Sequence, residues 1–248
     1  MGVRRVKIRT FFGSMCEQEV FNIADNKKDI NTAKPQVRFK TEEERLRHKW
    51  NISRRHHGRL FNANVSPECL YSTLTMDDEH EVHTFDDAKK VRDRYCRRLQ
   101  YANPNARIFI YIGRGKSTNR IHFHMVSLGI SAETIVKKWF EGKIVRVEHL
   151  RERNYYNGVD RGRDYTGLAN YLFDHWTPEQ GGGRKYKATK NMVQPVREEA
   201  TEIIRNYTKN SPPRAPKGYR LVDYRDNQFG YMCFTYIKDK PKSGKRRK

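Results

Sequence analysis

The stretch Arg120-Ile121-His122-Phe123-His124-Met125-Val126 lies at the centre of the fold that the sequence predicts. Its alternation of residue types predicts a β-strand, in which His122 and His124 project from one face and the apolar side chains from the other. Their Cα atoms would lie roughly 7 Å apart, so both imidazoles would reach one divalent cation if a third ligand completed the site. The alternative interpretation is a half-buried strand with two solvent-facing histidines.

The composition narrows the range of partners. The 248 residues suffice for one large domain or two small ones, and 51 Lys and Arg against 29 Asp and Glu give a net charge of +22. Such a charge attracts polyanions, and nucleic acid is the first to consider. No apolar run is long enough to span a membrane and residues 1–10 have no hydrophobic leader core, so neither a membrane nor secretion is expected. The four cysteines form no Cys-x-x-Cys pair, which favours the reducing cytoplasm of a cell or an infected host.

Hydrophobic periodicity predicts an α+β fold with a central antiparallel sheet and helices packed on it. The apolar residues after Thr84 recur at helical spacing, whereas the segments before and after the turn 113–119 alternate as the strands of a hairpin do. Helices are expected over about 42–57, 86–101, 131–141, 164–176 and 196–207. Strands are expected within 60–76 and over 107–112, 120–126, 143–149, 219–224 and 229–236.

Composition and periodicity together predict four regions. Residues 1–60 carry 15 basic and 7 acidic side chains, and we expect a basic, partly helical arm that either follows a phosphate backbone or packs loosely as a solvated face. Residues 61–208 would form the main domain. Residues 209–237 would form a proline-containing linker and a hairpin, and the basic residues 238–248 a disordered tail.

Tyr171 is the best candidate for a nucleophile. It follows the predicted sheet on a helix and carries His175 one turn later on the same helix face. A metal ion on the histidine strand would withdraw charge from a phosphate, and a phenol attacking a phosphodiester would leave a covalent phosphotyrosine and a free 3′-hydroxyl. The alternative is an aromatic core residue at helical spacing. The rival tyrosines are Tyr155, Tyr156 and Tyr165.

Three motifs resemble, in order and spacing, those of the HUH endonucleases. They are Leu70-Tyr71-Ser72-Thr73-Leu74-Thr75, Ile121-His122-Phe123-His124-Met125-Val126 and Leu168-Ala169-Asn170-Tyr171-Leu172. The resemblance covers roughly residues 45–235 and is closest to the rolling-circle replication initiators of bacterial plasmids, integrative elements and phages. Three motifs in sequence, each on a predicted element of the right type, are more specific than any one of them.

This resemblance implies that 61–208 is an HUH endonuclease domain with the RRM-like fold of replication initiators, the histidine pair at the centre of its sheet and the tyrosine helix beside it. It implies Mg²⁺ or Mn²⁺ as cofactor and a single-stranded or hairpin origin DNA, nicked by Tyr171 with attachment to the 5′ phosphate. A host helicase and polymerase would assist in the bacterial cytoplasm, since the chain has no Walker A loop. A relaxase or HUH transposase would share this chemistry, and a non-catalytic nucleic-acid-binding protein on the same fold is the alternative function.

Two departures from the family pattern bear on the site. Relatives often place a glutamate, the third metal ligand, near the end of the strand before the histidines, where this chain has Gly113. The third ligand therefore stays open, with Glu148 and the cluster Asp77-Asp78-Glu79 as possibilities. Relatives also commonly carry a lysine after the nucleophile, where this chain has His175, which would move a proton or contact the scissile phosphate.

Basic residues at the hairpin turn and in the loop 183–190 are expected to hold DNA through phosphate contacts, with one tyrosine stacking on a base. The alternative is that both segments are solvated connections. The predicted DNA-binding residues are Arg114, Lys116, Arg120, Arg184, Lys185, Tyr186, Lys187 and Lys190.

Overall fold

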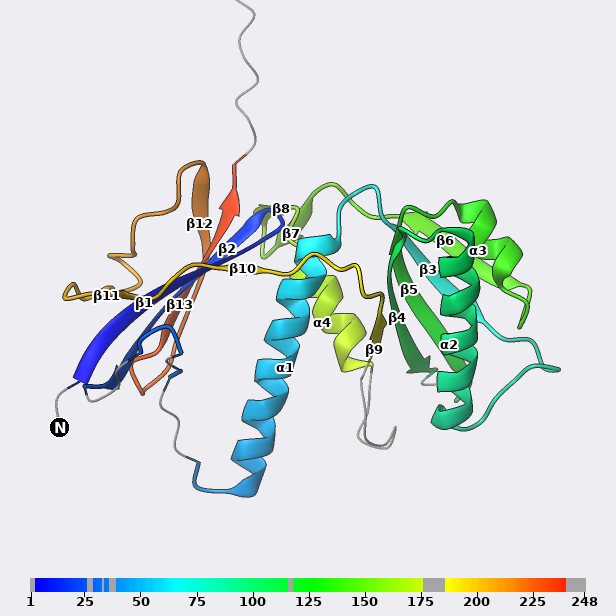
Figure 1. Ribbon diagram of the computed structural model, residues 1–248, viewed down its shortest axis with the longest axis horizontal. Helices are drawn as coiled ribbons and strands as arrows, with labels where there is room; N and C mark the ends of the chain where they lie inside the picture. Colours follow the sequence, from blue (N-terminus) through cyan, green and yellow to red (C-terminus); the bar gives the residue numbers. More distant parts are fainter. Residues whose placement is uncertain are drawn as a thin grey trace, which may run out of the picture. The chain divides into compact units, whose positions relative to one another are not determined.

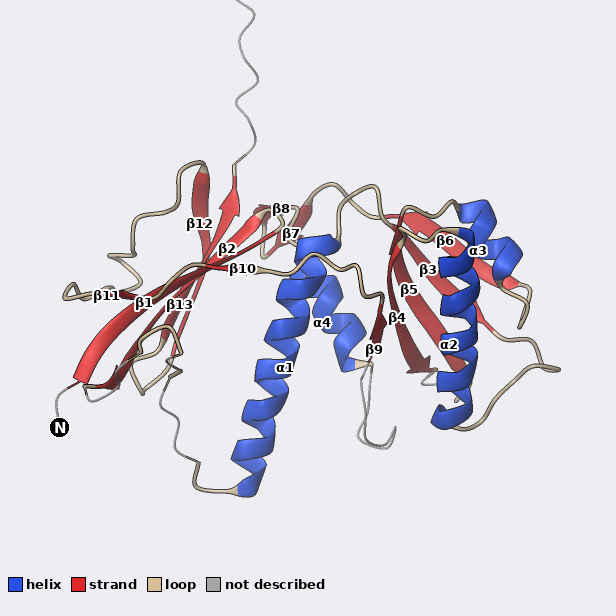
Figure 2. Cartoon of the chain, viewed as in Figure 1, coloured by secondary structure: helices blue, strands red, loops and turns tan. Residues whose placement is uncertain are grey.

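The computed structural model describes residues 3–25, 29–32, 34–35, 39–115, 118–175 and 186–239. It confirms the predicted α+β class, because the described ranges form antiparallel sheets with four helices packed on them (Figure 1, Figure 2). The chain divides into two compact units. One, called the motif unit here, comprises 51–154 and 165–194. The other, called the terminal unit, comprises 1–50, 155–164 and 195–248.

The motif unit is built on a five-stranded antiparallel sheet in the order β6-β3-β5-β4-β9. The histidine strand is β5, at the centre of this sheet, as the resemblance implied. Its neighbours β3 and β4 match the predicted strands, and β6 matches the strand expected over 143–149. The bounds are Leu70–Thr75 for β3, Arg107–Arg114 for β4, Ile121–Leu128 for β5, Ile144–His149 for β6 and Tyr186–Ala188 for β9.

Helices cover both faces of this sheet (Figure 1). Helices α2 (Phe85–Ala102) and α3 (Ala132–Lys138) pack on the face that carries Ile121, Phe123 and Met125. Helices α1 (Glu42–Asn64) and α4 (Thr166–Asp174) contribute Phe61, Ala169 and Leu172 to the core on the opposite face, with Phe109 and Val126. Because side chains alternate along a strand, His122 and His124 share the face of Val126 and lie on the α1 and α4 side.

The local signals for the helices of the motif unit were sound except at the end of α1. The Thr84 hydroxyl accepts from the Asp87 backbone N–H, and the Ser131 hydroxyl from that of Thr134, so both predicted caps are confirmed. Helix α1 continues to Asn64 instead of ending near His57, so the expectation of strand structure at 60–64 was wrong. The reason is burial of one face of its last turns, including Phe61, against the sheet, which stabilises helix where local propensity is weak.

The terminal unit contains a six-stranded sheet with the path β10-β1-β2-β13-β12 and β11 also on β1. Strands β1 (Val3–Phe12) and β2 (Met15–Ala24) form a hairpin around Gly13, whose φ is 57°. The predicted C-terminal hairpin is confirmed as β12 (Tyr219–Asp226) and β13 (Met232–Lys238). No strand was expected before residue 60, and β1 and β2 correct that. From Val6 to Phe12 buried residues alternate with partly exposed ones, two of them Lys7 and Arg9, and this pattern of a half-buried strand was overlooked in the expectation of a basic arm.

The helix predicted over 196–207 was wrong. The structure has two short strands instead, β10 (Val196–Arg197) and β11 (Thr201–Glu202), which pair with β1. The Ile203 N–H continues this pairing by donating to the Arg5 carbonyl. Without these two strands, the edge of β1 would leave backbone N–H and C=O groups without hydrogen bonds. Pairing with this edge stabilises the segment more than the helix would have done, and it leaves Ile204 fully exposed.

The expected loop 154–163 is instead a two-stranded hairpin of β7 (Asn154–Tyr156) and β8 (Val159–Gly162). The predicted tail 238–248 lies outside the described residues from 240 onward. Among the helices that the structure describes, none combines the length and apolarity needed to cross a membrane.

Candidate metal centre

Three histidines converge on the α1 and α4 side of the sheet. His122 and His124 come from β5, and His175 follows the last residue of α4 as its C-cap. One ligand atom from each of the three lies within 4.8 Å of the others, and no other such group occurs in the described residues. The predicted histidine pair is therefore joined by His175, which the sequence analysis placed beside the candidate nucleophile Tyr171 and not among the metal ligands.

The spacing of the two strand histidines fits one metal ion. Their Nε2 atoms are 3.1 Å apart. Two ligands about 2.1 Å from a common ion at that separation subtend an angle of about 95°, between the angles of octahedral and tetrahedral sites. None of the four acidic residues proposed as a third ligand belongs to this group, and three of them pair elsewhere. Asp77 bonds to His80, Asp78 pairs with Arg120, and Glu148 pairs with Arg146.

The other ring nitrogen, Nδ1, of each histidine has a partner within the protein. That of His124 lies 2.7 Å from the Tyr71 hydroxyl and 3.3 Å from the Thr73 hydroxyl, that of His175 lies 2.8 Å from the Tyr171 carbonyl, and that of His122 lies 3.5 Å from the Arg120 carbonyl. An imidazole that donates through Nδ1 keeps the lone pair on Nε2, the arrangement typical of metal-ligating histidines. Tyr71 and Thr73 reach His124 because β3 pairs with β5, with Thr73 directly opposite His124.

Both strand histidines are held in the unprotonated form. Burial, followed by the neighbouring His122 and His175, lowers the pKa of His124 to about 3. Burial also lowers the pKa of His122, where a hydrogen bond to the Arg120 carbonyl acts in the opposite direction. Neutral imidazole is the form that binds a metal ion, so His124 is available as a ligand well below neutral pH, and the pKa of His122 is shifted in the same direction.

Gly113 leaves room for this cluster. It lies opposite His122 in the β4–β5 register, and a Cβ at this position would be 2.7 Å from His122 Nε2 and 3.2 Å from His175 Cδ2. Any larger residue would collide with the His122 ring and crowd the His175 ring. The absence of a side chain on Gly113 thus leaves the space that His122 and His175 occupy.

Helix α1 holds α4, and with it His175, at both ends. The buried Asn62 side chain accepts a 2.8 Å hydrogen bond from the Tyr165 N–H at the N-terminus of α4, which has no side-chain cap of its own. At the other end, Arg54 makes a two-point contact with Asp174, at 3.1 and 2.5 Å. Arg54 and Asn62 lie about 12 Å apart along α1, close to the length of α4. Neither residue was among those predicted.

Tyr171 lies beside the histidines with an accessible ring. Its side of α4 faces the cluster, since its ring centroid is 4.2 Å from that of His175 and 6.1 Å from that of His124. It is 52% exposed, whereas the rival Tyr165 is 2% exposed and donates its hydroxyl hydrogen to the Arg151 carbonyl. The other rivals, Tyr155 and Tyr156, lie on the β7–β8 hairpin of the terminal unit. Among these candidate nucleophiles, Tyr171 is the one that lies at the cluster; the other tyrosine there, Tyr71, has its hydroxyl against His124 Nδ1.

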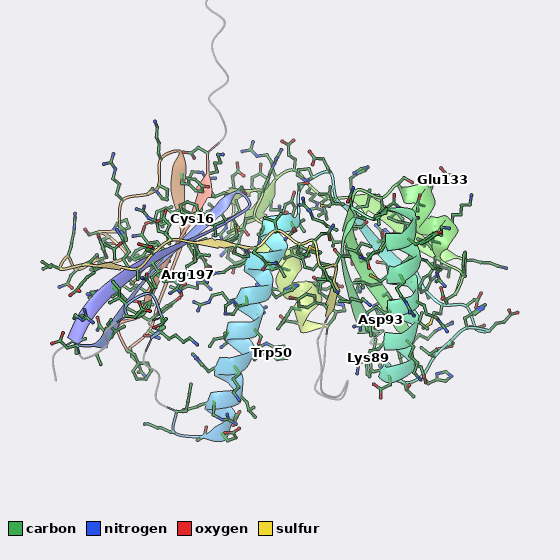
Figure 3. The ribbon with its side chains drawn as sticks, viewed as in Figure 1. Cys16, Trp50, Lys89, Asp93, Glu133 and Arg197 are labelled. Carbon is green, nitrogen blue, oxygen red and sulfur yellow. The ribbon has the colours of Figure 1, made fainter. Side chains whose placement is uncertain are left out.

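Several predicted DNA-binding residues already have partners within the protein. Arg114 donates to Asn119 and to the His83 carbonyl, and Arg120 donates to the Met76 carbonyl besides pairing with Asp78. Lys187 pairs with Asp93 of α2, which Figure 3 labels, at 3.2 Å. Tyr186 is half-buried against His57 and Tyr111, and Lys190 is exposed. Lys116, Arg184 and Lys185 lie outside the described residues.

Comparison with family models, with curated proteins and with solved structures found no match for this chain.

Proposed function

We propose that this protein is a metal-dependent, site-specific single-strand DNA endonuclease and strand transferase that starts rolling-circle replication. The observation that carries the proposal is the exposed phenol of Tyr171 beside three converging histidines. The three sequence motifs that resemble those of HUH endonucleases supply β3, β5 and α4, the elements that meet at this point. The net charge of +22 fits a polyanionic substrate.

In the proposed reaction, the Tyr171 hydroxyl oxygen attacks the phosphorus of a phosphodiester. The P–O bond to the 3′ oxygen breaks, and the products are a free 3′-hydroxyl and a phosphotyrosine on the 5′ end. The phenol proton passes to solvent, to which half of the Tyr171 side chain is open, and the 3′ oxygen takes up a proton as it leaves. Reversal by a 3′-hydroxyl rejoins the strand, since the tyrosyl ester retains the bond energy.

His175 acts as the third ligand in this proposal. Its Nδ1 is taken up by the Tyr171 carbonyl, so only Nε2 remains for a metal ion or for a proton in transit. A ring bound to metal through Nε2 cannot carry that proton, and the ligand role is favoured by the convergence with His122 and His124. His175 would then replace the glutamate that relatives place on the strand of Gly113.

The ligand set also bears on the choice of metal. A bound cation would withdraw charge from a non-bridging phosphate oxygen and orient the phosphorus for attack. Mg²⁺ prefers oxygen ligands, whereas imidazole suits the transition metals. Of the two ions that the resemblance implies, three imidazoles favour Mn²⁺ over Mg²⁺.

A random-sequence single-stranded DNA library incubated with the protein and Mn²⁺ tests the proposal. We expect a protein–DNA adduct that survives denaturation and a released 3′-hydroxyl that a polymerase can extend. Tyr171→Phe should abolish the adduct, and the matched control Tyr101→Phe, at a 91% exposed tyrosine on α2, should retain it. Tight, salt-sensitive binding without any adduct would contradict the proposal and favour the non-catalytic DNA-binding alternative.

A further inference from the structure

The hairpin of β7 and β8 is a tight and well-defined structure. Its two turn residues, Asn157 and Gly158, have φ values of 48° and 74°. Positive φ at both central positions is the geometry of a type I′ turn, whose twist matches that of the flanking strands. The Asn-Gly pair is the sequence that favours this turn most strongly, so the hairpin conformation is encoded locally.

The end of the hairpin distant from this turn is anchored to β12 within the terminal unit. Arg161 donates to the Val222 carbonyl at 2.9 Å and pairs with Asp164, and Arg220 donates to the Asp160 carbonyl at 2.5 Å. Residues 155–159, by contrast, are all exposed. The hairpin is therefore fixed at Asp160 and Arg161 and exposed over residues 155–159, which are called its tip.

Three large side chains on the tip of this hairpin are exposed to solvent. Tyr155 is 64% exposed, Tyr156 is 68% exposed and Val159 is 47% exposed. Consecutive residues of a strand point to opposite faces, so one tyrosine ring lies on each face of the hairpin. Two-stranded hairpins gain stability by burying one face, and here neither ring is buried. Exposed aromatic rings on an anchored element are available to stack on the bases of a nucleic acid.

The chain around the tip carries the charge that a nucleic acid requires. Within residues 151–163 the arginines Arg151, Arg153 and Arg163 are exposed against the one exposed acid Glu152, whereas Arg161 is engaged by Asp164. Tyrosine rings stack on unpaired bases of any sequence, and nearby cations hold the phosphates. A DNA strand that stacks on the hairpin follows one of its faces. Rings on both faces therefore match two DNA strands that diverge from the end of a duplex.

We propose that the β7–β8 hairpin binds the junction between duplex and single-stranded DNA, with Tyr155 and Tyr156 each stacking on an unpaired base of a different strand. The inference rests on the proposed function in taking DNA as the ligand. It adds a second DNA contact, separate in sequence from the three motifs, that selects a forked or hairpin structure instead of a plain single strand.

Binding of a forked duplex with two single-stranded arms tests the inference. The measurements are made in the Tyr171→Phe background, so the outcome does not depend on whether Tyr171 cleaves DNA. Tyr155→Ala and Tyr156→Ala should each weaken fork binding about tenfold, within the range for loss of one base–aromatic stack. In the same alanine variants, the affinity for a single-stranded arm without the duplex should fall less. Tyr156→Trp, which keeps an aromatic ring, should bind the fork as well as Tyr156 does. Tyr101→Ala is the matched control, an exposed tyrosine elsewhere on the surface.

A fluorescent base analogue, 2-aminopurine, at the first unpaired position of either arm reports the stacking itself. We expect quenching on both arms, with each alanine variant restoring the fluorescence of one arm. The proposal is overturned if the affinity for the fork is unchanged in both alanine variants, or if the affinity for the single arm falls as much as that for the fork. It is also overturned if neither alanine variant changes the 2-aminopurine fluorescence of either arm. Adduct formation by the protein with native Tyr171 is scored separately, so failure of the proposed nicking activity is distinguishable from failure of this inference.

Discussion

Gly113→Ala is the sharpest perturbation of the metal centre. The added Cβ would lie 2.7 Å from His122 Nε2, and ordinary contact begins at 3.4 Å. The ring would have to retreat by about 0.7 Å, whereas ligand distances in a metal site hold to within about 0.2 Å. Gly113 is not among the glycines with positive φ, so alanine strains no backbone and the effect arises from the Cβ alone. His122 must therefore leave its ligand position.

We expect Gly113→Ala to weaken Mn²⁺ binding by at least about 10- to 100-fold, measured by isothermal titration calorimetry. Crowding of these half-buried rings should also cost about 1 kcal/mol of unfolding free energy, the low end of the range for overpacking, measured by urea denaturation. Gly167→Ala is the matched control, because a Cβ on this α4 glycine meets nothing within 4 Å. Wild-type Mn²⁺ affinity in Gly113→Ala would refute the proposed convergence of the rings.

Three further perturbations test the surroundings of the site. Asn62→Ala removes the buried cap of α4 and should lower the unfolding free energy by about 1–3 kcal/mol in urea denaturation; unchanged stability would show that α4 does not depend on it. Tyr71→Phe removes the hydroxyl that orients His124 and should weaken Mn²⁺ binding about tenfold with the fold intact, whereas equal affinity in calorimetry would remove Tyr71 from the site. The metal-free protein should lose stability as pH falls below about 6.5 toward 3, because the unfolded chain protonates His124 while the folded state, with its pKa at about 3, does not. Thermal melts of His124→Gln should show a flatter pH dependence in this window, and an identical slope would contradict the assignment.

The motif unit was largely predictable because short-range patterns define its elements. Alternation marked β3 and β5, helical spacing marked α2 and α4, and Thr84 and Ser131 marked the caps. The convergence of His175 on the strand histidines was not predictable from spacing. It depends on where α4 lies, which Asn62 and Arg54 determine from a helix more than a hundred residues earlier in the chain.

The terminal unit was predicted less well because its strands are stabilised by distant partners. Strand β2 pairs on one side with β1 and on the other with β13, over 200 residues away. The helical spacing of residues 196–207 was genuine but lost to pairing with β1. The β7–β8 hairpin did carry a local signal, the pair Asn157-Gly158, which the expectation of a loop overlooked.

Mass spectrometry of the DNA adduct tests the proposed activity most directly. The protein is incubated with single-stranded DNA and Mn²⁺, digested with nuclease and protease, and searched for a peptide that carries a nucleotide. Our account predicts a single modified residue, Tyr171, linked to a 5′ phosphate and absent without the metal. A nucleotide on another tyrosine, or modification of Tyr171 that persists in His122→Ala and His175→Ala, would contradict it.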